Sequence, residues 1–387
     1  MLKIKSFNLK RRLPTCYLLS SKVLLSLAVI LSVYFIVMDI KLFHHAKTRG
    51  PYSGIKSSKN LSKFGLGDIK NKKYSLFWPL PVKKIMMAEA THFIRSPIAE
   101  FVEHGLGFSN LFPFISANFI SVTHCILSVV TIKFLMHDSL FWRQIGVAIF
   151  QFRNFLDSFD GVIFRVHANK TAYTSHYGSL GYYVDAFSDV FGGICLVGSI
   201  ALYLLKNRPP KKSLTRCFWL ADDLVESGST IEKSALTRST SSDDLFNNLA
   251  VNSNLRNKSP KEGIHATKIT ILTSVALLGI RIAVSAFFWD KSVRAYQDLL
   301  DSPAVSELHQ KLQVKILSST FTLLIMILWR IMNALSLQDM ILTAIFLDKT
   351  WEFVVKSQLV GWIVLISLII LTELHIAEVR SILLQVI

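Results

Sequence analysis

The chain has 387 residues, of which 51% are hydrophobic and only 18% are charged. A mean hydropathy of +0.42 is typical of a membrane protein and argues against a soluble globular enzyme. The 43 Lys and Arg exceed the 26 Asp and Glu by 17, and we interpret this excess as charge gathered outside the bilayer, with no nucleic-acid partner. The four cysteines contain no CxxC pair, so neither a zinc site nor a disulfide framework is indicated.

Seven stretches are apolar over roughly the 20 residues that a helix needs to cross a bilayer. In chain order they are Tyr17–Met38, Ile115–Leu135, Phe141–Leu156, Tyr182–Leu205, Ile269–Phe288, Val314–Met332 and Gln358–Leu374. The pattern therefore predicts an all-α polytopic membrane protein with about seven transmembrane helices.

The first stretch follows a basic N-terminus, 1–16, and no small-residue cleavage site comes after it. We interpret 17–38 as an uncleaved signal anchor whose N-terminus is cytosolic. Counting crossings from there places 39–95 and 157–181 in the lumen and the basic loop 206–266 in the cytosol. The lysines of this segment oppose the orientation. The whole lumenal stretch between the anchor and the next membrane helix, 40–114, has about 75 residues, however, and loop charge loses its influence beyond about 60 residues.

The remaining boundaries follow from composition. Residues 96–205 are expected to hold an interfacial helix and three membrane helices, and 267–387 the last three. The loop between them is rich in Ser, Thr and Asn, which is typical of a partly disordered linker. Two glycosylation sequons, at Asn60 and Asn169, fall in predicted lumenal segments.

Four aspartates lie beside or within predicted membrane helices, where a carboxylate is costly unless it is paired or binds a metal. They are Asp157, Asp160, Asp185 and Asp189. The members of each pair are three or four residues apart, so each pair shares one face of its helix and the two helices can present four carboxylates to each other. Oxygen ligands alone favour Mg²⁺ or Mn²⁺, and such ions at a membrane surface usually accompany a phosphorylated substrate.

The residues around these aspartates fit that interpretation. Gly161 and Gly181 remove side chains where a ligand would approach the backbone closely. Arg165 lies one helical turn beyond Gly161 and could contact a phosphate or hold a carboxylate. The structural alternative is that the aspartates cap helices or pair with Arg153 and Arg165 at the interface.

These residues form a motif that resembles the signature of the CDP-alcohol phosphotransferase family, D-x2-D-G-x2-A-R and, eight or nine residues later, G-x3-D-x3-D. Here the motif is Asp157-x2-Asp160-Gly161-x2-Phe164-Arg165, followed by Gly181-x3-Asp185-x3-Asp189. Phe164 stands where the family usually has Ala, and the gap 166–180 has 15 residues. Upstream, the stretch around Asn118 is similar to the family's PN-x-x-T sequence, with Ala for Pro and Ser for Thr.

The resemblance implies a core of six membrane helices, to which the signal anchor adds one. It also implies transfer of a phosphoalcohol from a CDP-alcohol to a lipid hydroxyl, with release of CMP and two divalent ions, Mn²⁺ or Mg²⁺. The implied metal ligands are Asp157, Asp160, Asp185 and Asp189, of which Asp189 is also the catalytic base. The implied substrate-binding residues are Asn118, Gly161, Arg165 and Gly181.

The Phe-Arg pair and the long gap resemble the same part of the sequence in an insect branch of this family. The members of that branch use CDP-ethanolamine and ceramide. That branch acts in the Golgi membrane with its site facing the lumen, where Mn²⁺ is favoured. Membrane lipids would then surround the protein. The sequence does not decide whether the chain forms a homodimer. Two alternatives remain: an ethanolamine or choline phosphotransferase that acts on diacylglycerol, and a polytopic cation transporter without enzymatic activity.

No local motif in the sequence indicates where the lipid acceptor binds. We expect its pocket among the later helices, with Arg281, Arg330, Asp339 and Glu352 as candidate polar groups, although each alone more often snorkels to the interface. Single histidines such as His124 are interpreted as structural.

Overall fold

The computed structural model describes residues 21–49, 76–77, 80–167, 180–210 and 265–385. The basic N-terminus, both sequons and most of the loop 206–266 lie outside these ranges. The predictions made for those segments therefore stay predictions.

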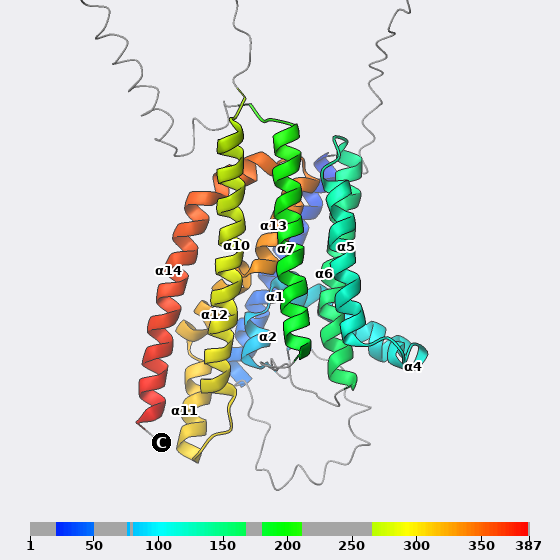
Figure 1. Ribbon diagram of the computed structural model, residues 1–387. Helices are drawn as coiled ribbons and strands as arrows, with labels where there is room; N and C mark the ends of the chain where they lie inside the picture. Colours follow the sequence, from blue (N-terminus) through cyan, green and yellow to red (C-terminus); the bar gives the residue numbers. More distant parts are fainter. Residues whose placement is uncertain (1–20, 50–75, 78–79, 168–179, 211–264, 386–387) are drawn as a thin grey trace, which may run out of the picture.

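Six long helices form an elongated bundle (Figure 1). They are α1 (Ser21–Arg49), α5 (Ala117–Leu135), α6 (Leu140–His167), α7 (Leu180–Lys206), α10 (Lys268–Tyr296) and α14 (Thr350–Leu384). Shorter helices accompany them: α2 (Val82–Met86), α3 (Ser96–Glu100), α4 (Phe108–Leu111), α11 (Glu307–Leu317), α12 (Thr320–Met332) and α13 (Ala334–Phe346). Three π-helical turns complete the described elements: η2 (Thr91–Arg95), η3 (Phe101–Gly105) and η5 (Gln297–Asp301).

Among the described residues, five helices are long and apolar enough to cross a membrane: α1, α5, α7, α10 and α14. The bent pair of α11 and α12 makes a sixth if it is counted as one span. Helix α6, which contains the predicted span Phe141–Leu156, is not among them because charged side chains interrupt it. It nevertheless packs against α5 (Figure 1), and also against α3 and α13. An all-helical polytopic membrane protein is thus confirmed, without a strand in the ranges that the structure describes.

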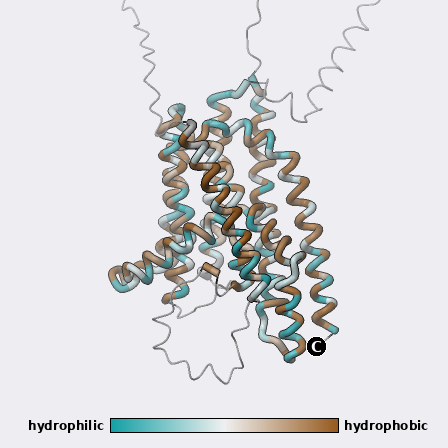
Figure 2. Tube along the Cα trace, turned by 180° about the vertical axis from the view of Figure 1, so that it is seen from behind, coloured by the Kyte–Doolittle hydropathy of each residue, from teal (hydrophilic) through white to brown (hydrophobic). Residues whose placement is uncertain are grey.

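The anchor helix α1 carries hydrophobic residues along most of its length, and it lies in front of the bundle in Figure 2. Side chains such as Ile30 and Ile36 are 63% and 60% exposed. Apolar surface of this extent is expected to face lipid tails. The opposite side of α1 buries Leu42 and Ala46 against the core.

The predicted span Val314–Met332 is not one straight helix. Helix α11 ends at Leu317, α12 begins at Thr320, and the two are bent by 55°. The hydroxyl of Ser319 accepts a hydrogen bond from the backbone N–H of Thr322 at 3.2 Å, which caps the new helix. The side chain of Asn333 caps α13 in the same way, so two polar caps divide an apolar stretch that hydropathy alone joins.

Arg330 is fully buried, although the sequence suggested that it would snorkel or line a lipid pocket. Its Nε lies 2.9 Å from Oδ1 of Asp39, and its Nη1 lies 3.0 Å from Nδ1 of His92. A buried charge requires such partners, so this ion pair fastens α1 to α12. Glu352 pairs instead with Lys349 near the start of α14, with N and O atoms 3.6 Å apart.

Arg281 and Asp339 are likewise held by protein groups. The guanidinium of Arg281 donates hydrogen bonds to the backbone carbonyl and the hydroxyl of Ser357 on α14. Asp339 on α13 accepts hydrogen bonds from Arg95 of η2 and, at 3.0 Å, from Gln151 of α6. These polar groups fix helices to one another, so the expected lipid pocket among the later helices does not follow from them.

Candidate active site

Three helices carry the site. Ser116 caps the N-terminus of α5, because its hydroxyl accepts a hydrogen bond from the N–H of Phe119 at 3.2 Å. Helix α6 continues through Asp157 and Asp160 to His167, beyond the apolar stretch, so both aspartates lie within a helix. In Figure 1 the end of α6 and the start of α7 lie at the same lower end of the bundle, opposite the junction of α7 with α10.

Asp160 is the most enclosed carboxylate of the site, with 6% of the residue exposed. Its Oδ2 accepts a hydrogen bond from the hydroxyl of Ser121 at 2.7 Å and lies 3.7 Å from Nε2 of His124. Both partners come from α5 and are themselves buried. The carboxylate is therefore positioned from a helix that the aspartate motif does not include.

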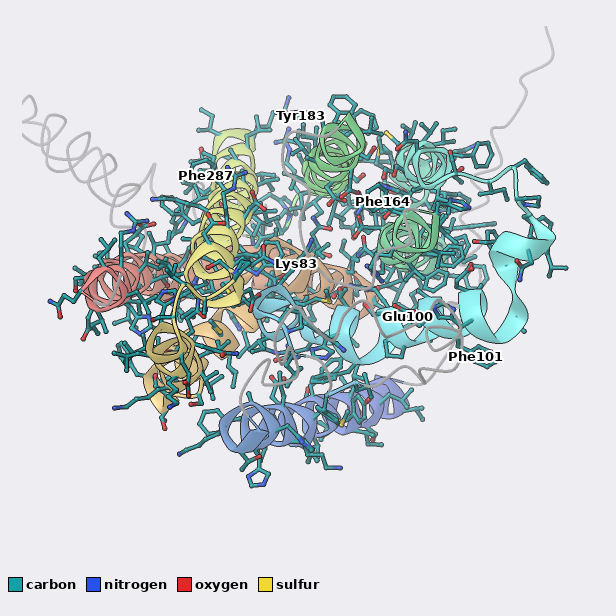
Figure 3. All side chains as sticks on the ribbon, turned by 90° about the horizontal axis from the view of Figure 1, so that it is seen from below. Lys83, Glu100, Phe101, Phe164, Tyr183 and Phe287 are labelled. Atoms are coloured by element: carbon teal, nitrogen blue, oxygen red, sulfur yellow. The ribbon has the colours of Figure 1, made fainter. Side chains whose placement is uncertain are left out.

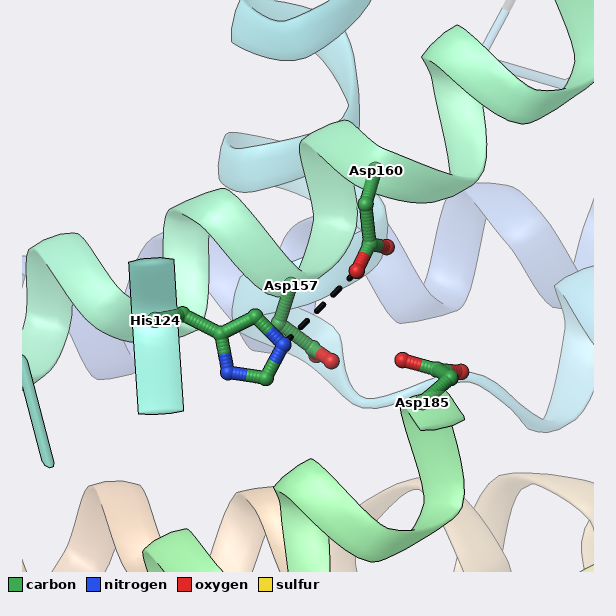
Figure 4. Close-up of side chains that lie close together, drawn as sticks. All are labelled: His124, Asp157, Asp160 and Asp185. Atoms are coloured by element: carbon green, nitrogen blue, oxygen red, sulfur yellow. Dashed lines mark ion pairs between the residues drawn. The ribbon is translucent and has the colours of Figure 1, made fainter. Parts of the chain in front are cut away.

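A group of four donors gathers between these helices (Figure 4). Ligand atoms of His124, Asp157, Asp160 and Asp185 all lie within 4.8 Å of one another. Oδ1 of Asp185 is buried and has no hydrogen-bond partner among the described residues. Crowded carboxylates repel each other, and an unpaired buried oxygen is costly. A divalent cation would remove both penalties, so the residues present fit the ions that the sequence predicts.

Asp189 has a different environment. Arg153, which is fully buried on α6, donates a hydrogen bond to Oδ1 of Asp189 at 2.7 Å and another to the carbonyl of Ser188 at 3.0 Å. Asp189 thus adjoins the group of four without belonging to it, and its predicted roles as a metal ligand and base stay predictions.

The predicted substrate-binding residues surround the aspartates. A Cβ on Gly181 would lie 3.7 Å from Oδ1 of Asn118, and one on Gly161 would lie 3.5 Å from Nη1 of Arg165. Arg165 donates a hydrogen bond to Oε1 of Glu100 on α3 at 3.0 Å. The arginine is therefore joined to the segment before the core, and its ion pair in this structure is with Glu100.

Two lysines of α2, Lys83 and Lys84, carry charge near the acidic groups of this region, and only a basic segment in the sequence indicated them. Figure 3 shows Lys83 and Glu100 on the short helices α2 and α3, which lie across one end of the bundle beside α1. Burial lowers the pKa of Lys83, against the opposing charge of Asp185. Burial also lowers the pKa of Lys84 to about 8, and the Glu100 carboxylate opposes that change. Cations near the carboxylates suit an anionic substrate.

His124 is the residue of the donor group that the sequence interpretation set aside as structural. A signal was available, because Asn118, Ser121 and His124 recur at intervals of three residues and so share one side of α5. A single histidine in an apolar helix carries little weight alone. Its position opposite Asp160 depends on how α5 packs on α6, which spacing along one helix does not determine.

Replacing Gly192 with alanine is expected to lower activity on the order of 10²-fold, because a 1 Å displacement of a positioned group can have that effect. A Cβ there would lie 2.7 Å from Nη2 of Arg153, so the guanidinium that donates to Asp189 must shift. Gly198→Ala is the matched control on α7, since nothing lies within 4 Å of its Cβ. Initial rates of both purified variants test this, and equal rates would contradict it.

Comparison with known proteins places this site in a family. A family model described as ceramide phosphoethanolamine synthase matches residues 17–243 and 246–386. The chain is also similar to the ceramide phosphoethanolamine synthase of Drosophila melanogaster, with 32% identity over 301 residues, which cover 78% of this chain and 68% of that protein. No solved structure matches the chain. The first matched range includes all residues of the aspartate motif.

Proposed function

Because the chain belongs to the ceramide phosphoethanolamine synthase family, we propose that it transfers phosphoethanolamine from CDP-ethanolamine to the primary hydroxyl of ceramide and releases CMP. The observation that carries the proposal is the donor group of His124, Asp157, Asp160 and Asp185, built within 4.8 Å on three helices. A site of this kind can hold divalent ions against a diphosphate. It also explains why acidic residues stand where a membrane protein usually excludes them.

In the reaction that we propose, the acceptor hydroxyl oxygen bonds to the phosphorus that carries ethanolamine. The bond from this phosphorus to the bridging oxygen breaks, and CMP leaves with that oxygen. The hydroxyl proton passes to the carboxylate of Asp189. A carboxylate is a weak base for an alcohol, so we expect proton transfer to be late and concerted with attack.

The other residues bind and orient the donor. Asp157, Asp160 and Asp185 would hold the divalent ions, Mn²⁺ or Mg²⁺, which when bound neutralise the diphosphate and polarise the phosphoryl group. Arg165 is placed by Glu100 to contact a phosphate, and Gly161 leaves room beside it. Gly181 and Asn118 lie next to each other, and we place the nucleotide beside them.

An apolar groove of about 360 Å³ between α5 and α7 adjoins the site. Its lining residues are Val122, Cys125, Ile126, Tyr183, Val184, Phe187 and Ser188. Cys125 directly follows His124, and Val184 directly precedes Asp185. Because the outer lining is exposed, a long-chain acceptor could enter from the bilayer with its hydroxyl next to the carboxylates. We place a hydrocarbon chain of ceramide in this groove.

Filling the groove with Ile126→Trp is expected to raise the KM for long-chain ceramide about tenfold, because excluding two methylenes costs about 1.6 kcal/mol. A short-chain ceramide, which does not reach the groove, should keep its KM. Ile363→Trp on α14 is the matched control, since Ile126 and Ile363 are 59% and 55% exposed. A rise that is independent of chain length would contradict this placement.

We further propose a Golgi membrane location with a cytosolic N-terminus and a lumenal site. The end of α6 and the start of α7 lie at one end of the bundle, and the end of α7 and the start of α10 lie at the other end (Figure 1). This arrangement supports separate compartments for the site and the long loop. Glycan attachment at Asn60 in intact cells is the test. A protease-accessible, unglycosylated Asn60 in sealed vesicles would overturn this orientation.

The test of the function uses purified protein in liposomes with Mn²⁺ and labelled CDP-ethanolamine. Ceramide and diacylglycerol are supplied in separate reactions. Labelled ceramide phosphoethanolamine and CMP in equal amounts are expected with ceramide. Product from diacylglycerol alone would indicate a glycerolipid phosphotransferase, and cation flux without any product would indicate a transporter.

A further inference from the structure

We propose that Nε2 of His124 is a direct ligand of the divalent ion at the aspartate site, and that this nitrogen makes the site prefer Mn²⁺ over Mg²⁺. The inference deepens the proposed function and depends on it only for the presence of a divalent ion. The aspartates alone would form an all-oxygen site.

The geometry of the imidazole carries the proposal. His124 has 0% exposure, and it extends from α5 toward the carboxylates of α6 and α7 (Figure 4). One of its ring nitrogens lies within 4.8 Å of an oxygen of each of Asp157, Asp160 and Asp185. Two atoms that bind one ion at about 2.1 Å each can be up to about 4.2 Å apart, so a modest contraction suffices.

A purely structural role explains the histidine poorly. Neither ring nitrogen has a hydrogen-bond partner among the described residues, and burying an unsatisfied polar atom is costly. The 3.7 Å separation from Oδ2 of Asp160 is longer than a hydrogen bond. Ser121 already donates to that same oxygen at 2.7 Å, so the carboxylate does not need the imidazole as its donor.

The nitrogen ligand changes which ion the site favours. Mg²⁺ is a hard ion that takes oxygen ligands and requires nearly ideal octahedral geometry. Transition-metal ions accept imidazole together with carboxylates, and helical bundles use that combination to hold two manganese or iron ions. A site with one imidazole and three carboxylates therefore discriminates against Mg²⁺ more than four carboxylates would.

Pulsed electron paramagnetic resonance of the Mn²⁺-loaded full-length protein tests direct coordination. The wild type is expected to show a ¹⁴N coupling to Mn²⁺, which changes to a ¹⁵N coupling when only histidine is labelled with ¹⁵N. His124→Gln should lose the coupling. The matched control, His104→Gln, changes a histidine that pairs with Glu100 and has a side chain that is 63% exposed, so it should keep the coupling.

A competition titration measures the preference. His124→Gln is expected to weaken Mn²⁺ binding about tenfold and to change Mg²⁺ binding by less than about threefold. His124→Asp, which supplies an oxygen, should move the preference toward Mg²⁺ and gives a second variant if the glutamine does not fold.

The outcomes separate this inference from the proposed function. Bound Mn²⁺ without nitrogen coupling in the wild type, or coupling that persists in His124→Gln, overturns the ligand role and leaves the transferase proposal intact. Absence of any Mn²⁺ binding by the wild type overturns the ligand role, and absence of both Mn²⁺ and Mg²⁺ binding overturns the transferase proposal as well. Equal losses of Mn²⁺ and Mg²⁺ affinity in His124→Gln would overturn the selectivity.

Discussion

Replacing Asp185 with asparagine is expected to reduce transfer of phosphoethanolamine by about 10²- to 10³-fold, the scale at which one preorganised electrostatic contact acts. The substitution preserves shape and removes one negative charge. Oδ1 of Asp185 is buried and unpartnered within the described residues, so no other interaction of that atom compensates for a lost cation. Initial rates with saturating ceramide and CDP-ethanolamine measure the loss.

The thermal stability of the same variant provides an independent test of the site. Without a metal ion, removing one of several crowded carboxylates relieves repulsion, so the thermal midpoint of Asp185→Asn should equal or exceed that of the wild type. Glu378→Gln, which changes an exposed carboxylate on α14, is the matched control and should keep full activity. Full activity in Asp185→Asn would refute the site.

The helices of the site could be predicted because their signal lies within each segment. Hydropathy located α5 and α7 to within about two residues, and motif spacing put each aspartate pair on one side of its helix. The break between α11 and α12 at Ser319 was not predicted, because a serine cap is a single polar residue inside an apolar run.

The partners of the aspartates could not be predicted in the same way. The pairing of Asp189 with Arg153 was left as one alternative among several, and the structure assigns it to Asp189 alone of the four aspartates. Ser121 contacts Asp160 because α5 packs on α6, and residue spacing along one helix does not predict that packing. Periodicity tells which residues share a face but not which faces meet.

The N-terminal segments are linked to the site and do more than anchor the chain in the membrane. Arg330 joins α1 to the core through Asp39, and its Nη1 also donates to the carbonyl of Ile85 on α2 at 3.0 Å. The same short helix brings Lys83 toward Asp185. Changes in α1 could therefore alter the charge around the carboxylates without touching them.

Removal of divalent ions is expected to reduce transfer to background, and added Mn²⁺ should restore it. The physical reason is that the carboxylates of Asp157, Asp160 and Asp185 must otherwise meet a diphosphate of the same charge. Mn²⁺ at about 100 times its Kd would stabilise the folded protein by about 2.7 kcal/mol, which raises the thermal midpoint by several degrees.

The thermal shift distinguishes binding at this site from an unspecific effect of the ion. In Asp160→Asn the carboxylate that Ser121 positions loses its charge, so Mn²⁺ should raise the midpoint little or not at all. Glu378→Gln should keep the full shift. An identical shift in Asp160→Asn and the wild type would mean that the ion binds elsewhere, whereas undiminished transfer in chelator would mean that the four clustered donors act without a metal.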